Sequence, residues 1–443
     1  MTFRPGSGAE IPPLQGEGGS RSDPGGVGPL PRPYPLQGDG ALPLAGKRVA
    51  IVHPAWHSCG TYSVVLGQIA AYKALGADVV AIANSDVPGF GTSSFFARQY
   101  AAQTPELDAT PRAFAGVPWH RALSPTFLRD AIIPFLHGDQ AAMRASASSA
   151  ADFSPDLARR DFDLVHCNHF FCMPVARRLA KGRPILLDTH DLQAQQFDLI
   201  NDARPILPPR ASRERMLERE LAEMRDTAAL LHLNADEERI FRDLLPGATH
   251  HLLYPPVPDV PTGPGGDEII LVSSWNAANL ESMLWFLREV FPRAGERPIK
   301  IAGNIDAGVR SADRALYDQY RHLFLGRVDD LGAVYAGARL ALLPTIAGTG
   351  LSIKTVEAMA SGLPLIASPL AFRGMAIDPG ALGNVAMAAD AEAFAAELRT
   401  AVTDTTGSSG DRAISDTRRA YDETFSEDAY AKRLMGIVTP ILI

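Results

Sequence analysis

The sequence predicts an α/β protein made of two doubly wound, Rossmann-like domains that face each other across a cleft. Short apolar runs alternate with amphipathic segments along most of the chain, the pattern of parallel strands joined by helices. A segment rich in proline and glycine, 254–266, divides this alternation into two halves. The stretch Leu340–Ser368 has the order strand, glycine loop, helix and strand, which is the repeating unit of such a domain.

These observations divide the chain into four expected parts. They are a tail (1–45), a first domain (46–258), a second domain (266–424) and a C-terminal helix (425–443). The tail is rich in glycine and proline and contains the near-repeat Pro13–Gly18 and Pro35–Gly40. Such a composition buries too little apolar surface to offset the entropy of the chain, so we expect the tail to be disordered.

Composition excludes several classes of protein. The 443 residues are 46% hydrophobic and 21% charged, as in globular proteins with full cores. A net charge of −8 argues against a nucleic-acid partner, which requires a basic surface. Neither a membrane-length apolar run nor a secretory signal is found, which favours the cytoplasm, with the inner face of the membrane as an alternative. Cys59, Cys167 and Cys172 lack zinc-site spacing, so buried thiols are expected and no metal.

The first expected strand, Lys47–Val52, leads into the loop Ser58–Thr61 and then a helix. The loop is not G-x-G-x-x-G, which counts against a dinucleotide oxidoreductase. Trp56, His57 and Tyr62 lie close to it and are candidates for stacking on a sugar, although ordinary packing explains them as well.

Polar residues follow two further expected strands, Asp163–His166 and Pro184–Asp188. His166 and the sequence Asp188-Thr189-His190-Asp191 then lie at carboxyl ends of strands, where open α/β sheets bind ligands. We expect His190 to act on the substrate, with a purely structural histidine as the alternative. The stretch 87–153 is expected to be irregular, with loops or helices.

The glycine loop of the second domain is the strongest candidate for a binding site. Gly348-Thr349-Gly350 precedes a helix that starts near Ser352, and a helix start presents unpaired N–H groups and partial positive charge to an anion. Lys354 and Glu357 follow on one face of this helix. A phosphate site with a ribose-binding carboxylate is one interpretation, and a tight turn with a surface ion pair is the other.

The segment GTGLSIKTVEAMASGLPLIAS, 348–368, resembles the donor-binding signature of the retaining glycosyltransferase family 4, the glycosyl transferases group 1 type, which has the GT-B fold. This resemblance covers about residues 47–435. It implies a hexosyltransferase that moves a sugar, with retention, from a nucleoside-diphosphate sugar to a glycan, a lipid-linked or a small-molecule acceptor. It further implies a role in surface polysaccharide or glycoconjugate synthesis, without a cofactor or metal.

The resemblance also assigns roles to residues. His190 and Lys354 are the implied catalytic residues, and the 425–443 helix returns to the first domain. The implied donor-binding residues are Thr349, Gly350, Leu351, Ser352, Ile353 and Glu357, with Arg327 and Val328 of the GRVD sequence beside the base. The implied acceptor-side residues are Cys59, Gly60 and Asp191.

Two positions depart from the family pattern. Thr349 stands where the family has the first acid of its paired-acid motif, which contacts the donor sugar, so the sugar stays open. The stretch 273–279 lacks the Arg and Lys that usually neutralise the leaving diphosphate, a task that we assign to Lys354. These departures leave two alternatives, a non-catalytic nucleotide-sugar-binding subunit and a nucleotide-sugar epimerase or phosphorylase of the same architecture.

Overall fold

The structure is a computed structural model, and it describes residues 42–57, 59–86, 94–195, 210–263, 265–295, 297–403 and 411–442. The expected tail therefore lies outside the described residues as far as position 41. Within the described part, Leu44 is buried in the core of the first domain, and its amide donates to the carbonyl oxygen of Leu75 at 2.9 Å. Core packing thus already includes Leu44, three residues before the strand that we expected to start at Lys47.

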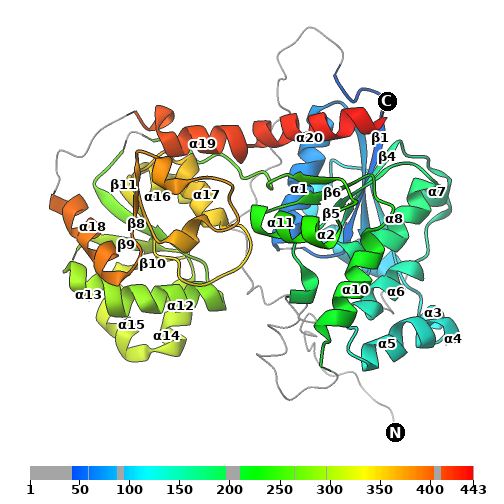
Figure 1. Cartoon of the computed structure of the whole chain (residues 1–443), viewed down its shortest axis with the longest axis horizontal. Helices are drawn as coiled ribbons and strands as arrows, with labels where there is room; N and C mark the ends of the chain where they lie inside the picture. Colours follow the sequence, from blue (N-terminus) through cyan, green and yellow to red (C-terminus); the bar gives the residue numbers. More distant parts are fainter. Residues whose placement is uncertain are drawn as a thin grey trace.

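The first domain, on the right in Figure 1, is built on a parallel seven-stranded sheet with the order β3-β2-β1-β4-β5-β6-β7. The order reverses between β1 and β4, which is the switch point where such sheets bind ligands. The strands are β1 (Arg48–Pro54), β2 (Asp78–Asn84), β3 (Arg112–Ala115), β4 (Leu164–Asn168), β5 (Ile185–Asp188), β6 (Ala229–His232) and β7 (His250–Leu252).

Helices cover both faces of this sheet because its strands are apolar on both sides. One face packs against α1 (Gly60–Ala74) and α20 (Glu427–Leu442), with α2 (Ser94–Gln103) near β3. The other face packs against α6 (Ala141–Ser149), α8 (Met173–Ala180), α10 (Arg213–Met224) and α11 (Ala235–Leu244). Shorter helices are α3 (Trp119–Ala122), α4 (Pro125–Phe127), α5 (Ile133–Leu136) and α7 (Pro155–Arg159). The expected helices of the stretch 87–153 are present as α2 to α6, and strand β3 within the same stretch was not expected.

The second domain repeats the architecture with a parallel six-stranded sheet in the order β10-β9-β8-β11-β12-β13. Its strands are β8 (Glu268–Val272), β9 (Ile299–Ala302), β10 (Phe324–Gly326), β11 (Ala338–Leu343), β12 (Leu365–Ala367) and β13 (Val385–Met387). One face packs against α12 (Ala277–Trp285), α13 (Phe291–Ala294), α14 (Ile305–Ala312), α15 (Arg314–Tyr320) and α18 (Ala391–Thr403). The other packs against α16 (Leu331–Ala336), α17 (Ile353–Ala360) and α19 (Asp416–Thr424). The prediction of two doubly wound α/β domains is confirmed.

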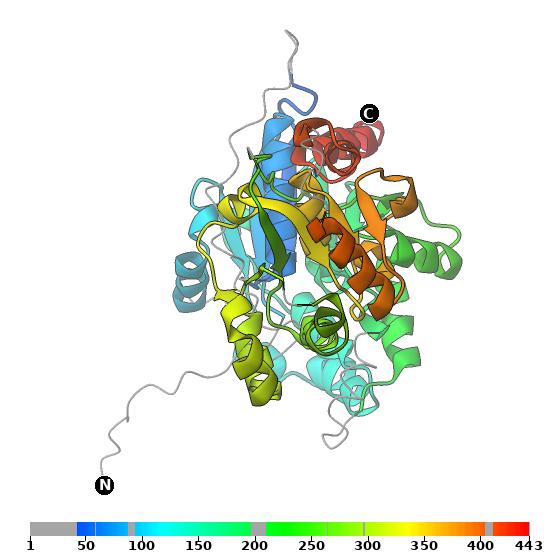
Figure 2. The same cartoon turned by 90° about the vertical axis from the view of Figure 1, so that its left-hand side faces the viewer.

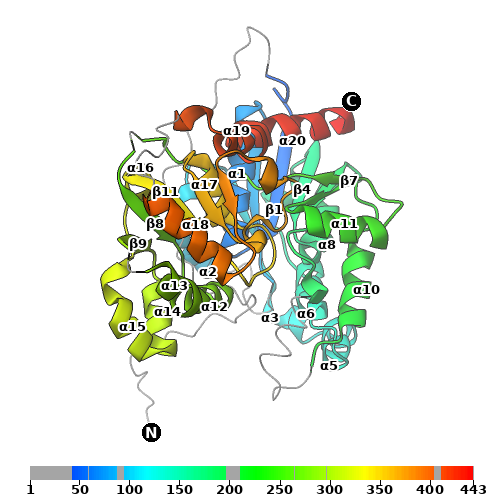
Figure 3. The ribbon, with the colours of Figure 1, turned by 60° about the vertical axis from the view of Figure 1, so that its left-hand side comes forward.

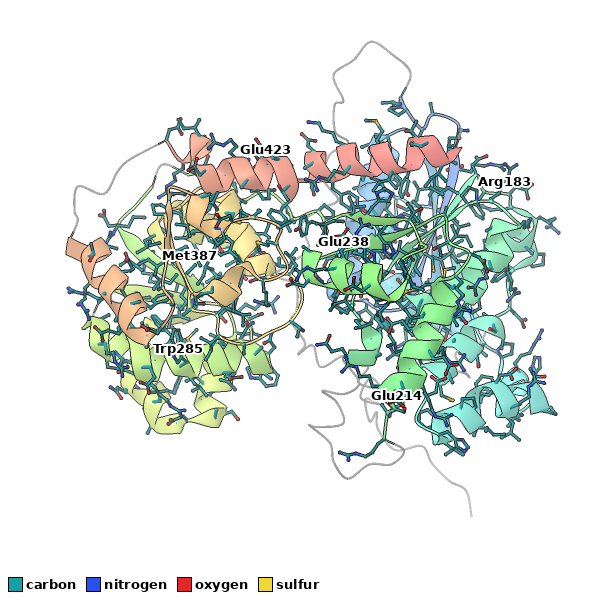
Figure 4. All side chains as sticks on the ribbon, viewed as in Figure 1. Arg183, Glu214, Glu238, Trp285, Met387 and Glu423 are labelled. Atoms are coloured by element: carbon teal, nitrogen blue, oxygen red, sulfur yellow. The ribbon has the colours of Figure 1, made fainter. Side chains whose placement is uncertain are left out.

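The C-terminal segment consists of two helices, α19 and α20, and α20 lies within the expected C-terminal helix. Phe425 separates them and is buried in the second domain, so α19 belongs to that core. Beyond it, Tyr430, Leu434 and Val438 of α20 pack into the same core as α1. Figures 2 and 3 show α20 lying beside α1 from two directions. Figure 4 labels Glu423, which lies on α19 beside the second domain. It also labels Arg183, which lies on the side of the first domain that faces away from the second domain. The chain therefore crosses from the first domain to the second and back.

The connection between the domains is fixed to the second domain. Tyr254 and Val257 are buried in its core, and the Tyr254 hydroxyl accepts a hydrogen bond from the amide of Ala376 at 2.6 Å. The Tyr421 hydroxyl of α19 donates to the carbonyl of Val257 at 2.8 Å. Among the described residues, we find no helix with the length and apolar composition needed to cross a membrane.

Candidate functional site

The carboxyl ends of the two sheets meet where the domains touch. Asp191 follows β5 and Gly350 follows β11, and a Cβ on Gly350 would lie 3.7 Å from Oδ1 of Asp191. Nearby, the amide of Ala235 donates to the carbonyl of Gly374 at 2.8 Å, and the amide of Gly374 donates to Asp236 at 2.9 Å. The tertiary structure therefore brings the expected acceptor-side loop to the expected donor loop.

The glycine loop bends sharply before α17. Gly348 and Gly350 have φ angles of 125° and 65°, which glycine adopts without the steric cost of a side chain. Ser352 is the N-cap of α17, and its hydroxyl accepts from the Thr355 hydroxyl at 2.9 Å instead of from a backbone amide. Within the described part of the chain, the amides of residues 351–354 have no hydrogen-bond acceptor. Four N–H groups and the helix dipole are thus available to an anion.

Lys354 lies in the first turn of α17 and points to the carboxyl ends of β8 and β11. Its Nζ donates to Oδ1 of Asn279 at 2.7 Å, and both residues line a cavity of about 10 Å³ beside Ser273 and Pro344. Burial and the nearby Arg373 guanidinium lower the pKa of Lys354 to about 8. Most Lys354 side chains are therefore still charged at neutral pH.

A second cation, Arg373, lies against the same loop. Its Nε donates to the carbonyl of Thr349 at 3.3 Å and its Nη1 to that of Leu370 at 3.1 Å. Burial lowers the pKa of Arg373 below its usual value. No carboxylate forms an ion pair with Lys354 or Arg373 among the residues that the structure describes. Sequence reasoning missed Arg373, although its position shortly after β12 places it at the functional edge of a doubly wound sheet.

Glu357 lies one turn after Lys354 and is partly buried. Burial raises its pKa to about 7, so near neutral pH it exchanges between the acid and the carboxylate. Tyr335 is a titratable neighbour of Glu357, since the Glu357 charge adds to burial in raising the Tyr335 pKa. Lys354 bonds to Asn279 and not to Glu357, so the described contacts do not include the surface ion pair offered as the alternative.

His190 is held at the end of β5 by a buried network. Its Nε2 lies 2.9 Å from Oδ1 of Asn168, while the Asn168 amide group donates to Gln68 at 2.9 Å. Gln68 in turn donates to Asp188 at 3.0 Å. This arrangement fixes the tautomer with hydrogen on Nε2, and Nδ1 has no partner among the described residues. Burial lowers the pKa of His190 to about 3, so the ring is neutral.

His169 stacks on His190, with ring centroids 4.1 Å apart and an angle of 10° between the planes. Its Nε2 lies 3.1 Å from the Thr61 hydroxyl, which connects the start of α1 to the histidine pair. Both histidines have positive φ angles, 66° for His169 and 56° for His190, a strained conformation that is common at functional sites. The sequence places His169 next to a strand end, a signal that could have identified it.

Two buried carboxyl groups hold the loop after His190. Glu220 of α10 accepts from the amides of Gln193 and Ala194, each at 3.1 Å, and Glu237 of α11 accepts from Leu192 at 3.3 Å. Burial raises the pKa of Glu220 and of Glu237 to about 8, and for Glu237 the Asp191 charge adds to this effect. These groups were not identified from the sequence.

The remaining predicted site residues are more dispersed. Cys59 is the half-buried N-cap of α1, and Gly60 begins that helix and is exposed; Ser58 lies outside the described residues. Arg327 is exposed and Val328 partly buried after β10, two strands from β8.

In the donor loop, Thr349 and Ile353 are exposed, Leu351 is partly buried and Ser352 is buried. His166 was wrongly placed at a strand end: it lies inside β4 and its Nδ1 is 3.0 Å from the Tyr72 hydroxyl.

Comparison with known proteins identifies a family for the second domain. Residues 266–404 match the model of the family described as Glycosyl transferases group 1. The second domain is a glycosyl transferases group 1 domain. Over 93 residues, this chain is 41% identical to the phosphatidyl-myo-inositol mannosyltransferase of Mycobacterium leprae. That match spans 20% of this chain and only about a quarter, 24%, of the length of the mannosyltransferase.

Solved structures resemble the two-domain fold over most of the chain. HepE from Anabaena in complex with UDP and glucose matches with a TM-score of 0.51 and 12% identity, covering 89% of this chain and 100% of that chain. Sucrose-phosphate synthase from Thermosynechococcus elongatus matches with a TM-score of 0.56 and 16% identity, covering 89% and 99%. At these identities the likeness establishes the GT-B fold alone.

Proposed function

We propose that the protein is a glycosyltransferase that moves a sugar from a nucleoside-diphosphate sugar to a hydroxyl group, with retention of anomeric configuration. The observation that carries the proposal is the meeting of Lys354, Arg373 and the unpaired amides of 351–354 at one loop. Two cations that pair with no carboxylate among the described residues, together with a helix start, form a site for a multiply charged anion. The leaving group of a nucleotide sugar is such an anion.

The catalytic contribution of this group is electrostatic. When the bond between sugar and diphosphate breaks, negative charge grows on the diphosphate, and preorganised donors that face this charge lower the barrier. Each 1.4 kcal/mol of such stabilisation is worth about a factor of ten in rate. In this proposal Lys354 and Arg373 supply the charge that the family usually takes from two cations after β8.

The nucleoside part of the donor extends from the loop toward β10. Glu357, one turn into α17, is suited to accept hydrogen bonds from ribose hydroxyls in its carboxylate form. Arg327 and Val328 would border the base. The structure of HepE from Anabaena contains UDP, which supports a uridine nucleotide among the donors to be tried first.

On the acceptor side, neutral His190 has Nδ1 available to accept a hydrogen bond from the attacking hydroxyl. Asp191 and the start of α1, with Cys59 and Gly60, would border the acceptor. The departing diphosphate would take the acceptor proton in a front-face reaction. We further propose a role in surface polysaccharide or glycoconjugate synthesis, in the cytoplasm or at the inner membrane face.

The test uses the purified full chain with a panel of uridine, guanosine and adenosine diphosphate sugars. Thermal unfolding is measured first, because a ligand that binds only the native state raises the melting temperature. Each stabilising donor is then incubated with sugar, lipid-linked and small-molecule acceptors, and the anomeric configuration of the product is determined by NMR. Transfer with retention supports the proposal, and inversion contradicts the mechanism.

Thr349 keeps the non-catalytic alternative relevant, because it replaces an acid that contacts the sugar in the family. A donor that raises the melting temperature yet is neither transferred nor hydrolysed with any acceptor would favour a nucleotide-sugar-binding subunit. Conversion of the donor sugar to an epimer without an acceptor would favour an epimerase. Either result would overturn the proposed transfer reaction.

A further inference from the structure

Four buried polar side chains form a hydrogen-bonded relay beside helix α1, from Asp188 to His190. Asp188, Gln68 and Asn168 are fully buried, and His190 is almost so. The Gln68 amide group donates to Oδ2 of Asp188 and to Oδ1 of Asn168, each at 3.0 Å. Asn168 returns a bond to Oε1 of Gln68 at 2.9 Å, and its Oδ1 lies 2.9 Å from Nε2 of His190. The relay thus joins α1 to the carboxyl ends of β4 and β5.

The carboxyl group of Asp188 sets the direction of this relay. Its Oδ1 accepts from the backbone amide of His190 at 3.3 Å and its Oδ2 accepts from Gln68, so both oxygens are acceptors. Gln68 must therefore direct its NH2 group to Asp188, and the same group then faces the oxygen of Asn168. The carbonyl oxygen of Val52, 3.4 Å from Nδ2 of Asn168, favours the same orientation. An oxygen that faces Nε2 of His190 requires hydrogen on that nitrogen, which leaves Nδ1 as an acceptor.

The same side chains have a second consistent arrangement. If position 188 presented a donor to Gln68, the Gln68 amide would turn its oxygen toward that donor, and the Asn168 amide would have to turn as well. Nδ2 of Asn168 would then donate to Nε2 of His190, and Nδ1 would carry the hydrogen. The distances need not change, because the oxygen and the nitrogen of each amide exchange places. The side chain at position 188 therefore decides between the two tautomers.

Packing alone does not account for an acid at position 188. Burial raises the pKa of Asp188, because a carboxylate away from water is costly, and the hydrogen bonds that it accepts lower this pKa. Its titratable neighbours are His190, Asp191, Tyr72 of α1 and Tyr430 of α20. His190 is neutral, so in the described part of the chain no cation pairs with Asp188. Asparagine has nearly the same shape without the charge, so an acid here indicates a task beyond filling space.

We propose that Asp188 is a positioning residue that acts on the substrate through His190. Its carboxylate keeps hydrogen on Nε2 of the ring, which leaves Nδ1 as the acceptor for the attacking hydroxyl. The role of His190 in transfer rests on the proposed function. The tautomer of His190, in contrast, follows from the relay alone and can be measured without a substrate.

The first measurement identifies the tautomer of His190 by NMR. The full chain is labelled with 15N-histidine, and two-bond correlations from the ring C–H protons show which nitrogen carries hydrogen. His190→Gln assigns the signal among the 11 histidines, and a pH of 9 keeps Asp188 ionised. We expect hydrogen on Nε2 in the unmodified protein and on Nδ1 in Asp188→Asn. In that variant the new side chain accepts from the His190 amide with its oxygen and therefore turns its NH2 group to Gln68.

The second measurement is steady-state kinetics with the donor found in the panel. Asp188→Asn should lower kcat at least tenfold, because Nδ1 no longer accepts from the hydroxyl. The KM for the donor should change less than twofold, since the donor loop lies in the second domain. The melting temperature should equal or exceed that of the unmodified protein, because a buried charge without a cation is removed. A residue that only supports the fold would lose stability and activity together.

Asp163→Asn is the matched control, because Asp163 also accepts a backbone N–H, from Arg48 at 2.8 Å, but precedes β4 at the other end of the strand. It should leave the His190 tautomer and kcat unchanged. If Asp188→Asn fails to fold, Gln68→Met decides, since it interrupts the relay and should give a mixture of both tautomers.

Hydrogen on Nε2 alone in the folded relay variant, or hydrogen on Nδ1 in the unmodified protein, would overturn the proposal. A kcat within threefold of the unmodified value in Asp188→Asn would overturn it as well. If the unmodified protein transfers no sugar, the proposed function fails in that assay, and the spectra alone decide whether Asp188 sets the tautomer.

Discussion

Nζ of Lys354 lies 2.7 Å from Oδ1 of Asn279, and this hydrogen bond joins the first turn of α17 to the first turn of α12. Asn279 is itself fixed, since its backbone N–H donates to Oδ1 of Asn276 at 2.7 Å and its side-chain amide donates to the carbonyl of Ser274 at 2.9 Å. A neutral amide thus positions the ammonium group without neutralising it. The charge of Lys354 stays available to a ligand.

Replacing Lys354 by alanine should reduce turnover at least a hundredfold, because the charge that stabilises the leaving diphosphate is lost. Steady-state kinetics with the donor found in the panel measure this. Lys300→Ala is the matched control: Lys300 pairs with Glu268 at the start of the same sheet and should change turnover less than twofold. A loss below threefold in Lys354→Ala would remove this residue from the mechanism.

Asn279→Asp should weaken binding of the nucleoside diphosphate about tenfold, since a carboxylate beside Lys354 would pair with the ammonium group and repel the ligand. Isothermal titration calorimetry with the diphosphate measures the change. Asn279→Ala removes the hydrogen bond without adding charge and should cost less affinity. Tighter binding to the aspartate variant would contradict this account of the Lys354 charge.

Transfer should decline as pH rises above about 8, because the lowered pKa of Lys354 lies there and deprotonation removes its charge. The ordinary lysine pKa is near 10.4, so an exposed lysine would keep its charge through this range. The activity of Lys354→Arg, whatever its level at neutral pH, should stay constant up to pH 9.5. His190, neutral down to about pH 3, should not contribute to the profile between pH 5 and 9. An unchanged profile in Lys354→Arg would assign the decline to another group.

Glu357→Gln should stabilise the fold at pH 8 and leave it nearly unchanged at pH 5. The pKa of Glu357 is raised in the folded state, so the folded protein holds this proton more tightly than the unfolded chain does. Stability is therefore lost as pH rises from about 4.5 through about 7, and the amide avoids this loss. The gain should be about 1 to 3 kcal/mol in the free energy of unfolding. Denaturant titration at both pH values measures it, and the variant should also bind ribonucleotides less tightly.

Gly348→Ala should disturb the anion site beyond the cost of its backbone conformation. At a φ of 125° a side chain is strained, and the new Cβ would lie 2.9 Å from Nη2 of Arg373 and displace it. Gly182→Ala is the control, with a φ of 87° and open space around the Cβ. Both variants should lose stability, about 1 kcal/mol or more. Only Gly348→Ala should lose affinity for the diphosphate, and equal affinity in the two variants would exclude this role for Arg373.

Local sequence was enough for the architecture and for the donor loop. The strands can be recognised as continuous apolar runs because both faces of each sheet are covered by helices. Gly348 and Gly350 predict a turn whose backbone conformation other residues adopt with difficulty. Strands β3, β7 and β13 were not predicted from the sequence. The expected C-terminal helix was bounded at 425, but the ring of Phe425 is buried in the core of the second domain, a contact that local sequence does not reveal.

The sequence by itself determined two doubly wound domains and a helix start with Lys354 and Glu357 on one face, because helix and strand periods depend on neighbours in the chain. Only the tertiary structure decided that Arg373 joins Lys354, that Asn168 and Gln68 set the tautomer of His190, and that Asp191 meets Gly350. These contacts join residues far apart in the chain, and burial sets the pKa values of the groups involved. Distance and burial exist only once the chain is folded, so no reading of local pattern could supply them.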